Sequence, residues 1–280
     1  MTVATGLAGQ PPTSAQTYQR LRSHLAFLKM AAAAEALPAV LDAAREDGTP
    51  PLEAIEALLA VQVNATEHRQ QASRLHFANL PAPWSLDDYD FSAQPGVDEK
   101  LIRELATLRF LDDAANVILI GPPGVGKTML GIGLARAAAE AGHKAYFTTC
   151  EELVRRLKKA ITEHRLVTGL RFFAQPRLLV IDEFGYRRLD EDGRSLLFEV
   201  VNARYLKGSI ITTSHVGIQG WAERLGDPML AAALIDRLLH RGILVGIDGP
   251  SYRMRSHQAR ADALRKTTRA GTAPRTEAAS

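Results

Sequence analysis

Apolar residues along the chain follow two repeats, one typical of strands and one typical of helices. Five short runs of apolar and β-branched residues predict buried strands, over residues 117–120, 144–149, 178–183, 208–215 and 243–247. Elsewhere apolar residues recur every three to four positions and predict helices, over residues 97–111, 129–141, 150–161, 192–206 and 227–240. Strands that alternate with helices in this way predict an α/β domain.

The first part of the chain has helical periodicity and no strand pattern. A leucine stripe begins near Thr17, and we expect Pro38 to kink or restart that helix. Pro51 follows a Gly-Thr-Pro break and opens a second helix. We therefore predict a small helical domain over residues 17–80. It binds DNA or a partner protein, or else it is an oligomerisation or packing appendage.

Composition places the chain among ordinary soluble proteins. It has 280 residues, enough for one α/β domain and a smaller appendage. No apolar run approaches the roughly 20 residues of a membrane span, and the N-terminus lacks the basic and apolar regions of a signal peptide. The single cysteine, Cys150, excludes a disulfide framework. We expect a cytoplasmic protein with no membrane partner.

The net charge of +3 is unevenly distributed along the chain. We expect residues 1–16, rich in Gly, Pro, Ser and Thr, to be disordered. The α/β body, residues 81–252, follows a Leu-Pro-Ala-Pro-Trp linker, and acids and bases nearly balance within it. Residues 253–280 carry seven Lys/Arg and two Asp/Glu. We expect this basic tail to be disordered and to grip DNA without sequence preference.

The stretch GPPGVGKT fits the phosphate-binding loop G-x-x-x-x-G-K-[ST] and stands between a predicted strand and a predicted helix. Its glycines let backbone N–H groups turn onto phosphate oxygens, next to the positive end of the helix dipole. Lys127 is expected to reach the β and γ phosphates of ATP, and Thr128 to hold Mg²⁺. The predicted nucleotide-binding residues are Gly121, Pro122, Pro123, Gly124, Val125, Gly126, Lys127, Thr128 and Met129.

Two adjacent acids end the third predicted strand. Asp182 is expected to contact Mg²⁺ directly or through its water, and Glu183 to orient and polarise the attacking water. The strand should lie in the middle of the sheet, with its acids at the carboxyl end where ligands bind. The next strand ends at His215, our candidate for a side chain between the acids and the γ-phosphate. Thr213 and Ser214 are weaker candidates.

The phosphate loop contains no arginine, so a cation from a neighbouring subunit is expected to complete the site. Arg237 is the first choice, and it shares a helix face with Arg241. The alternative is that Arg237 pairs on the surface with Asp236 or Glu223.

Basic residues also cluster on one helix and one loop. They are Arg155, Arg156, Lys158 and Lys159 on the helix, and Arg187 and Arg188 on the loop after the acids. Such clusters form solvated or salt-bridged surfaces, or they follow a phosphate backbone when several subunits align them. Both interpretations remain open.

These motifs together resemble the IstB-like ATPases, which belong to the DnaC-like clade of AAA+ proteins. The resemblance covers residues 75–255 and includes GPPGVGKT, LLVIDEFGY, ITTSH, LIDRLLHRG and SYRMR. It implies a five-stranded parallel sheet of order 5-1-4-3-2 flanked by helices, with Arg237 as the arginine finger. It also implies a magnesium-dependent ATPase that oligomerises with ATP, binds duplex DNA without sequence preference and assists a cognate transposase.

The chain departs from the family pattern at two places. His215 stands where the family usually has Asn, which changes the geometry and pH dependence of the sensor position. Arg187 and Arg188 replace the usual Leu-Pro. No lid domain is apparent after the last strand. Two other functions stay open: a helicase loader acting on single-stranded DNA, and a nucleotide-dependent protein adaptor.

Overall fold

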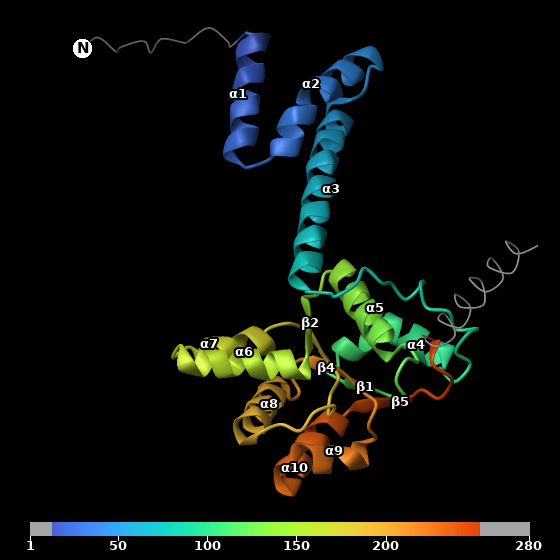
Figure 1. The fold of residues 1–280 in the computed structure, drawn as a ribbon. Helices are drawn as coiled ribbons and strands as arrows, with labels where there is room; N and C mark the ends of the chain where they lie inside the picture. The colour runs from blue at the N-terminus through green and yellow to red at the C-terminus, as the bar shows by residue number, and fades with distance from the viewer. Residues whose placement is uncertain (1–12, 253–280) are drawn as a thin grey trace, which may run out of the picture. The chain divides into compact units, whose positions relative to one another are not determined.

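The computed structural model describes residues 13–252, which fall into two compact units that divide between Ala72 and Ser73. The first unit contains three helices, α1 (Ser14–Phe27), α2 (Ala31–Glu46) and α3 (Pro51–Phe77), the last of which continues past the dividing point (Figure 1). Among residues 13–252, none of the helices combines the length and the apolar composition that a membrane crossing demands.

The first unit is held together by a small apolar core of Leu25, Ala33, Leu37 and Leu58. The helix start differs from the prediction at Thr17, because the Thr13 hydroxyl accepts a hydrogen bond from the Gln16 N–H and caps α1 three residues earlier. Residues 14–16, expected to be disordered, are therefore helical, whereas residues 1–12 lie outside the described part.

The break between α1 and α2 is also not where we predicted it. Lys29 has a left-handed backbone, with φ of 59°, and it ends the first helical segment. Pro38 lies inside α2, which continues past it. A proline removes one N–H from the helix ladder, and here that loss does not interrupt the helix. Gln62 on α3 stabilises the start of α2, since its side-chain oxygen accepts the Ala33 N–H at 3.2 Å.

The second unit is built on a five-stranded parallel sheet of order β2-β3-β4-β1-β5. Read from the other edge this is 5-1-4-3-2, so the expected fold is confirmed. The strands are β1 (Asn116–Ile120), β2 (Ala145–Thr149), β3 (Leu178–Asp182), β4 (Ser209–Ser214) and β5 (Gly242–Gly246). All five carboxyl ends lie at one edge, which places the predicted site residues there.

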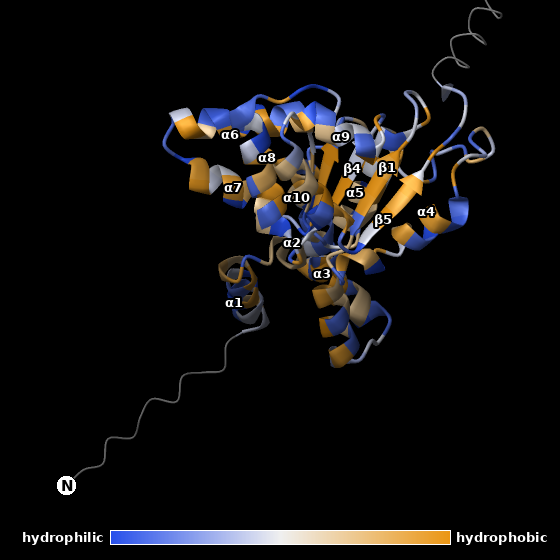
Figure 2. Cartoon of the chain, turned by 90° about the horizontal axis from the view of Figure 1, so that it is seen from below, coloured by the Kyte–Doolittle hydropathy of each residue, from blue (hydrophilic) through white to orange (hydrophobic). Residues whose placement is uncertain are grey.

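Helices cover both faces of this sheet (Figures 1 and 2). Strand residues alternate between the two faces. Val117 belongs to a core formed with α5 (Lys127–Glu140) and α4 (Glu99–Ala106), whereas Ile118 belongs to a core on the opposite face. That second core is formed with α6 (Cys150–Thr162), α7 (Leu166–Ala174), α8 (Glu191–Arg204), α9 (Ile218–Leu225) and α10 (Pro228–Leu239).

Three local predictions need correction. The single helix expected over residues 97–111 is broken, because Leu108 has a φ of 64° between α4 and the short 3-10 helix η1 (Arg109–Leu111). The short helices α7 and α9 were not predicted. Gly242, expected to close α10, is the first residue of β5, and the left-handed residue that ends the turn is Arg241, with a φ of 57°.

Candidate nucleotide-binding site

The phosphate loop connects β1 to α5 and has the backbone that its glycines permit. Gly124 and Gly126 have φ of 85° and 96°, a region that side chains disfavour. A Cβ on Gly126 would lie 2.5 Å from the Tyr89 ring, and one on Gly124 would collide with the Ser251 hydroxyl. The loop therefore has two reasons to keep these glycines: its conformation and the chain segments that pack over it.

Lys127 and Thr128 begin α5 at the foot of this loop. The Lys127 ammonium is buried and donates hydrogen bonds of 2.7 Å to the carbonyl oxygens of Gly121 and Pro122. The ammonium is therefore held across the loop in which the phosphates are expected to bind. Both residues therefore lie at the loop, and their contacts with phosphate and Mg²⁺ stay predictions.

A group of oxygen atoms suited to Mg²⁺ lies beside Thr128. The Thr128 hydroxyl is 3.0 Å from one Asp182 carboxylate oxygen and 3.2 Å from the other, and Asp182 is almost fully buried. The described residues contain no group of three or more His, Cys, Asp or Glu that could hold a metal by themselves. One carboxylate and one hydroxyl fit Mg²⁺, which keeps waters and takes substrate phosphates as its other ligands.

Thr213 connects the two acids, a role that sequence reasoning underrated. Its hydroxyl hydrogen-bonds the Asp182 carboxylate and accepts the Glu183 backbone N–H at 3.2 Å. Glu183 has a φ of 58°, so the chain turns sharply after β3 and leaves the Glu183 side chain exposed at the sheet edge. The available signal was the position of Thr213 at the carboxyl end of the strand next to Asp182.

His215 lies just after β4, beside this group. Its ring is 5.0 Å from the Tyr186 ring, edge to face. Burial lowers the pKa of the imidazole, and the positive charges of Lys127 and Arg224 lower it further, while Glu183 opposes them. The structure therefore brings His215 within electrostatic range of both the phosphate-loop lysine and the proposed catalytic acid.

An open cavity of about 600 Å³ adjoins the loop, and the residues that line it outside the motif carry no sequence signal. They are Pro83, Trp84, Asp88, Tyr89, Asp90, Gln94 and Tyr252. The Tyr89 hydroxyl donates to the Val125 carbonyl at 2.8 Å, and burial raises its pKa to about 12. A cavity of this size with aromatic walls suits a nucleotide base. The loop and the cavity together form one continuous candidate nucleotide site.

Comparison with known proteins agrees with this site. Residues 23–260 match the family model of the IstB-like ATP binding protein. The chain belongs to this family. A relative from Pseudomonas aeruginosa, named for insertion sequence IS21 and for ATP binding, is 44% identical over 205 residues, which are 73% of this chain and 77% of that protein. A Geobacillus stearothermophilus protein, named for insertion sequence IS5376 and for ATP binding, is 38% identical over 237 residues, or 85% and 94% of the two chains.

Solved structures agree on the fold. DnaI superposes with a TM-score of 0.52 at 21% identity and covers 59% of this chain and 91% of its own. DnaA bound to AMPPCP and single-stranded DNA gives a TM-score of 0.51 at 20% identity, and the match covers 61% of this chain and 52% of the DnaA chain. Likeness at this level of identity shows that the IstB-like chain shares the fold of these two proteins.

Arg237, the family's expected arginine finger, lies at the far end of the sheet from the phosphate loop. Its carbonyl accepts from the side chain of Asn116, the first residue of β1, at 3.4 Å, whereas the loop follows the last residue of β1. A five-residue strand at roughly 3.3 Å per residue separates these ends by about 13 Å. An arginine side chain does not span that length, so Arg237 lies too far from its own loop. The alternative pairing with Asp236 or Glu223 is wrong, because the guanidinium instead donates to Asn202 and Ala233.

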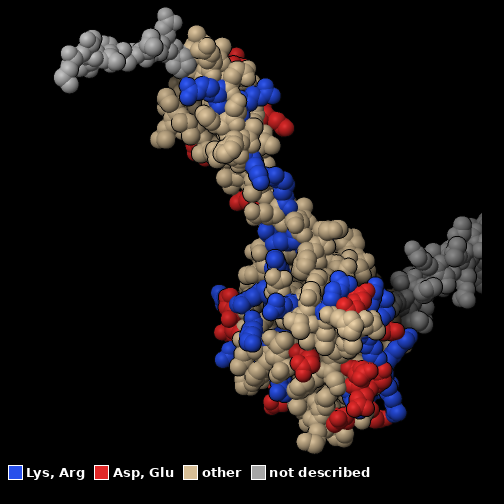
Figure 3. All heavy atoms as spheres, turned by 90° about the vertical axis from the view of Figure 1, so that its left-hand side faces the viewer, with Lys and Arg blue, Asp and Glu red and all other residues tan. Residues whose placement is uncertain are grey.

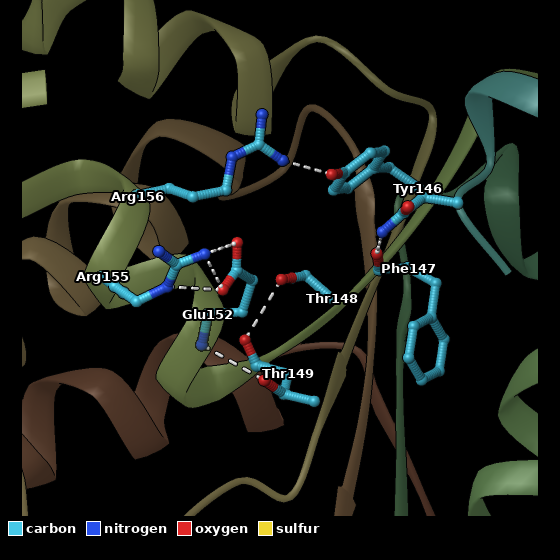
Figure 4. A network of polar contacts seen from close by, with 8 residues as sticks. Tyr146, Phe147, Thr148, Thr149, Glu152, Arg155 and Arg156 are labelled. Atoms are coloured by element: carbon cyan, nitrogen blue, oxygen red, sulfur yellow. Dashed lines mark hydrogen bonds and ion pairs between the residues drawn. The ribbon is translucent and has the colours of Figure 1, made fainter. Parts of the chain in front are cut away.

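The six cations expected to contact DNA have partners within the chain. Five are paired with acids, four of them as follows: Arg155 with Glu152, Lys159 with Glu163, Arg187 with Glu151 and Arg188 with Glu223. Figure 4 shows the Arg155 pair and Arg156, which donates to the Tyr146 hydroxyl and lies 4.6 Å from the Phe172 ring. Lys158 pairs with Asp190, which also caps α8. Figure 3 shows both basic and acidic side chains on one face of the protein, gathered partly in separate patches. The ion pairs themselves make the surface that carries the six cations salt-bridged.

Proposed function

We propose that this IstB-like protein is a magnesium-dependent ATPase that assembles on duplex DNA without sequence preference and assists an insertion-sequence transposase. One observation carries the ATPase assignment: Lys127, Thr128, Asp182 and Glu183 converge at one edge of the sheet beside a nucleotide-sized cavity. The insertion-sequence role follows from what the relatives are named for.

The contacts in the site suggest which group binds each part of the nucleotide. The aromatic cavity holds the base, and the backbone N–H groups of the loop and the Lys127 ammonium bind the phosphates. Thr128 and Asp182 hold Mg²⁺, which neutralises charge that develops on the phosphate oxygens. Glu183 accepts a hydrogen bond from the water that attacks the γ-phosphorus. The bond to the β–γ bridging oxygen then breaks, and ADP and phosphate leave.

Arg237 acts across a subunit boundary. Because it lies at the amino end of its own strands, it completes the site of a neighbouring copy and senses the γ-phosphate there. Assembly and nucleotide state are thereby coupled, and hydrolysis resets the assembly.

Two single substitutions test the ATPase proposal. Glu183→Gln is expected to bind ATP normally and to hydrolyse it at least about a hundredfold more slowly, since it removes the group that polarises water. Arg237→Ala is expected to bind ATP as a free subunit and to hydrolyse it poorly. ATP affinity by calorimetry and phosphate release provide the readouts. Wild-type turnover by Glu183→Gln would falsify its assigned role, and wild-type turnover by Arg237→Ala would remove the shared site.

A helicase loader on single-stranded DNA remains the second candidate, because DnaI and DnaA share the fold. A protein adaptor that does not touch DNA is the third. The three candidate functions differ in the nucleic acid that they bind: duplex DNA, single-stranded DNA or none.

A further inference from the structure

The guanidinium of Arg237 is held in a fixed position by two side chains of α8. Its Nε donates to the Asn202 side-chain oxygen at 3.1 Å, and its Nη1 donates to the Ala233 carbonyl within α10 at 2.8 Å. The Phe198 ring lies 4.7 Å below the guanidinium carbon. The Tyr205 ring lies 5.9 Å away, so two polar contacts and two aromatic rings together restrict a side chain that otherwise has many rotamers.

The chemistry of this support differs from that around the other surface arginines. Arg155, Arg187 and Arg188 each face a carboxylate, which neutralises them. Among the ion pairs of residues 13–252, Arg237 takes part in none. An amide oxygen accepts a hydrogen bond but carries no net charge, so Asn202 orients the guanidinium and leaves its positive charge intact.

The contacts also leave the binding edge of the guanidinium available. Arginine carries five N–H donors, and the contacts to Asn202 and Ala233 use two of them. The Nη2 group, whose donors form the fork with Nη1, is not among the donors in these contacts. A phosphate oxygen of a partner copy fits that edge, since paired N–H groups match phosphate geometry.

We propose that Asn202 and Phe198 are positioning residues, which hold Arg237 charged and oriented for the γ-phosphate bound to a neighbouring copy. The inference rests on the proposed function, because it assumes that Arg237 acts across the subunit boundary. Asn202 is exposed, whereas Phe198 is partly buried and also packs against the core shared by α8 and α10. A role confined to tying α10 to α8 is the competing explanation.

The Asn202→Asp substitution separates the two explanations. It keeps the oxygen that accepts from Arg237 and adds a charge, so a purely structural tie is kept or strengthened and the melting temperature does not fall. A positioning role requires an uncharged acceptor, and kcat for ATP hydrolysis is then expected to fall roughly tenfold, with KM changed less than about twofold. Ser195→Ala, on the same helix and bonded only to Glu191 in the described structure, is the matched control.

Subunit mixing tests whether the effect crosses the boundary. Asn202→Ala retains an intact phosphate loop, and Lys127→Ala retains an intact Arg237. We expect a mixture of the two to hydrolyse ATP faster than the sum of the separate variants, since some interfaces then combine both intact halves. No gain on mixing, or wild-type kcat in both Asn202 variants, overturns the positioning role. If Arg237→Ala itself is fully active, the shared site of the proposed function fails instead.

Discussion

At the scale of single residues, the site depends on one hydroxyl as much as on the two acids. Thr213 hydrogen-bonds the Asp182 side chain and the Glu183 backbone, so it fixes the positions of the proposed metal ligand and the proposed base relative to each other. Hydrogen bonds to charged groups are worth about 1.5–3 kcal/mol. Their loss should therefore affect the chemical step more than nucleotide binding.

The neighbouring threonine provides a matched control for this idea. Thr213→Val is expected to slow hydrolysis roughly tenfold to a hundredfold while ATP affinity stays nearly constant. The buried Thr212 hydroxyl has no hydrogen-bond partner in the described structure, so Thr212→Val should leave turnover unchanged and stability unchanged or higher. Phosphate release measures the turnover of the two variants, and thermal melting measures their stability. Equal turnover in the two variants would contradict the role given to Thr213.

His215 predicts a pH dependence of stability. Its folded-state pKa lies below the ordinary value of 6.5, so the unfolded chain binds this proton more readily. The contribution of His215 to stability is expected to be complete above about pH 6.5. The free energy of unfolding should then decrease as the pH falls below that value. Urea unfolding at pH 7.5 and 5.5, compared with His215→Asn, isolates the contribution. An equal decrease in the variant would show that other groups cause it.

At the scale of elements, local motifs were predictable and tertiary neighbours were not. The phosphate loop and the acids after β3 were found from sequence because each motif is a strand followed directly by its functional residues. Trp84 and Tyr252 stand far from the loop in sequence, and only folding brings them to the cavity. Asn202 is likewise distant from Arg237 and carries no motif. The predicted helix over residues 97–111 was longer than α4, because Leu108 continues the apolar stripe although its backbone is left-handed.

Helix α6 is the element on which the proposed DNA contact depends. Its exposed ion pairs contribute only about 0–1 kcal/mol each, so a phosphate backbone can replace their carboxylates at little cost. Arg155→Gln with Lys159→Gln is expected to weaken duplex binding and to lower the slope of log affinity against log salt by about two. Arg103→Gln with Arg109→Gln, which removes two similarly exposed paired cations near α4, is the control. Equal salt slopes in both double variants would remove α6 from the interface.

At the scale of the whole molecule, one chain carries two groups of site residues that lie too far apart to act in the same site. The phosphate loop and the acids lie at the carboxyl end of the sheet, and Arg237 lies at the amino end. If Arg237 acts as proposed, a single copy does not assemble its own complete centre, and we expect ATP hydrolysis to require a second copy.

Fluorescence anisotropy tests whether this protein binds duplex DNA in a nucleotide-dependent way, by measuring DNA affinity with and without a non-hydrolysable ATP analogue. A long duplex is compared with a single strand of equal length at two salt concentrations. We expect tight, salt-sensitive binding to the duplex that requires the nucleotide and is lost in Lys127→Ala. A preference for the single strand would favour the helicase loader, and the absence of binding to either would contradict the DNA-binding function altogether.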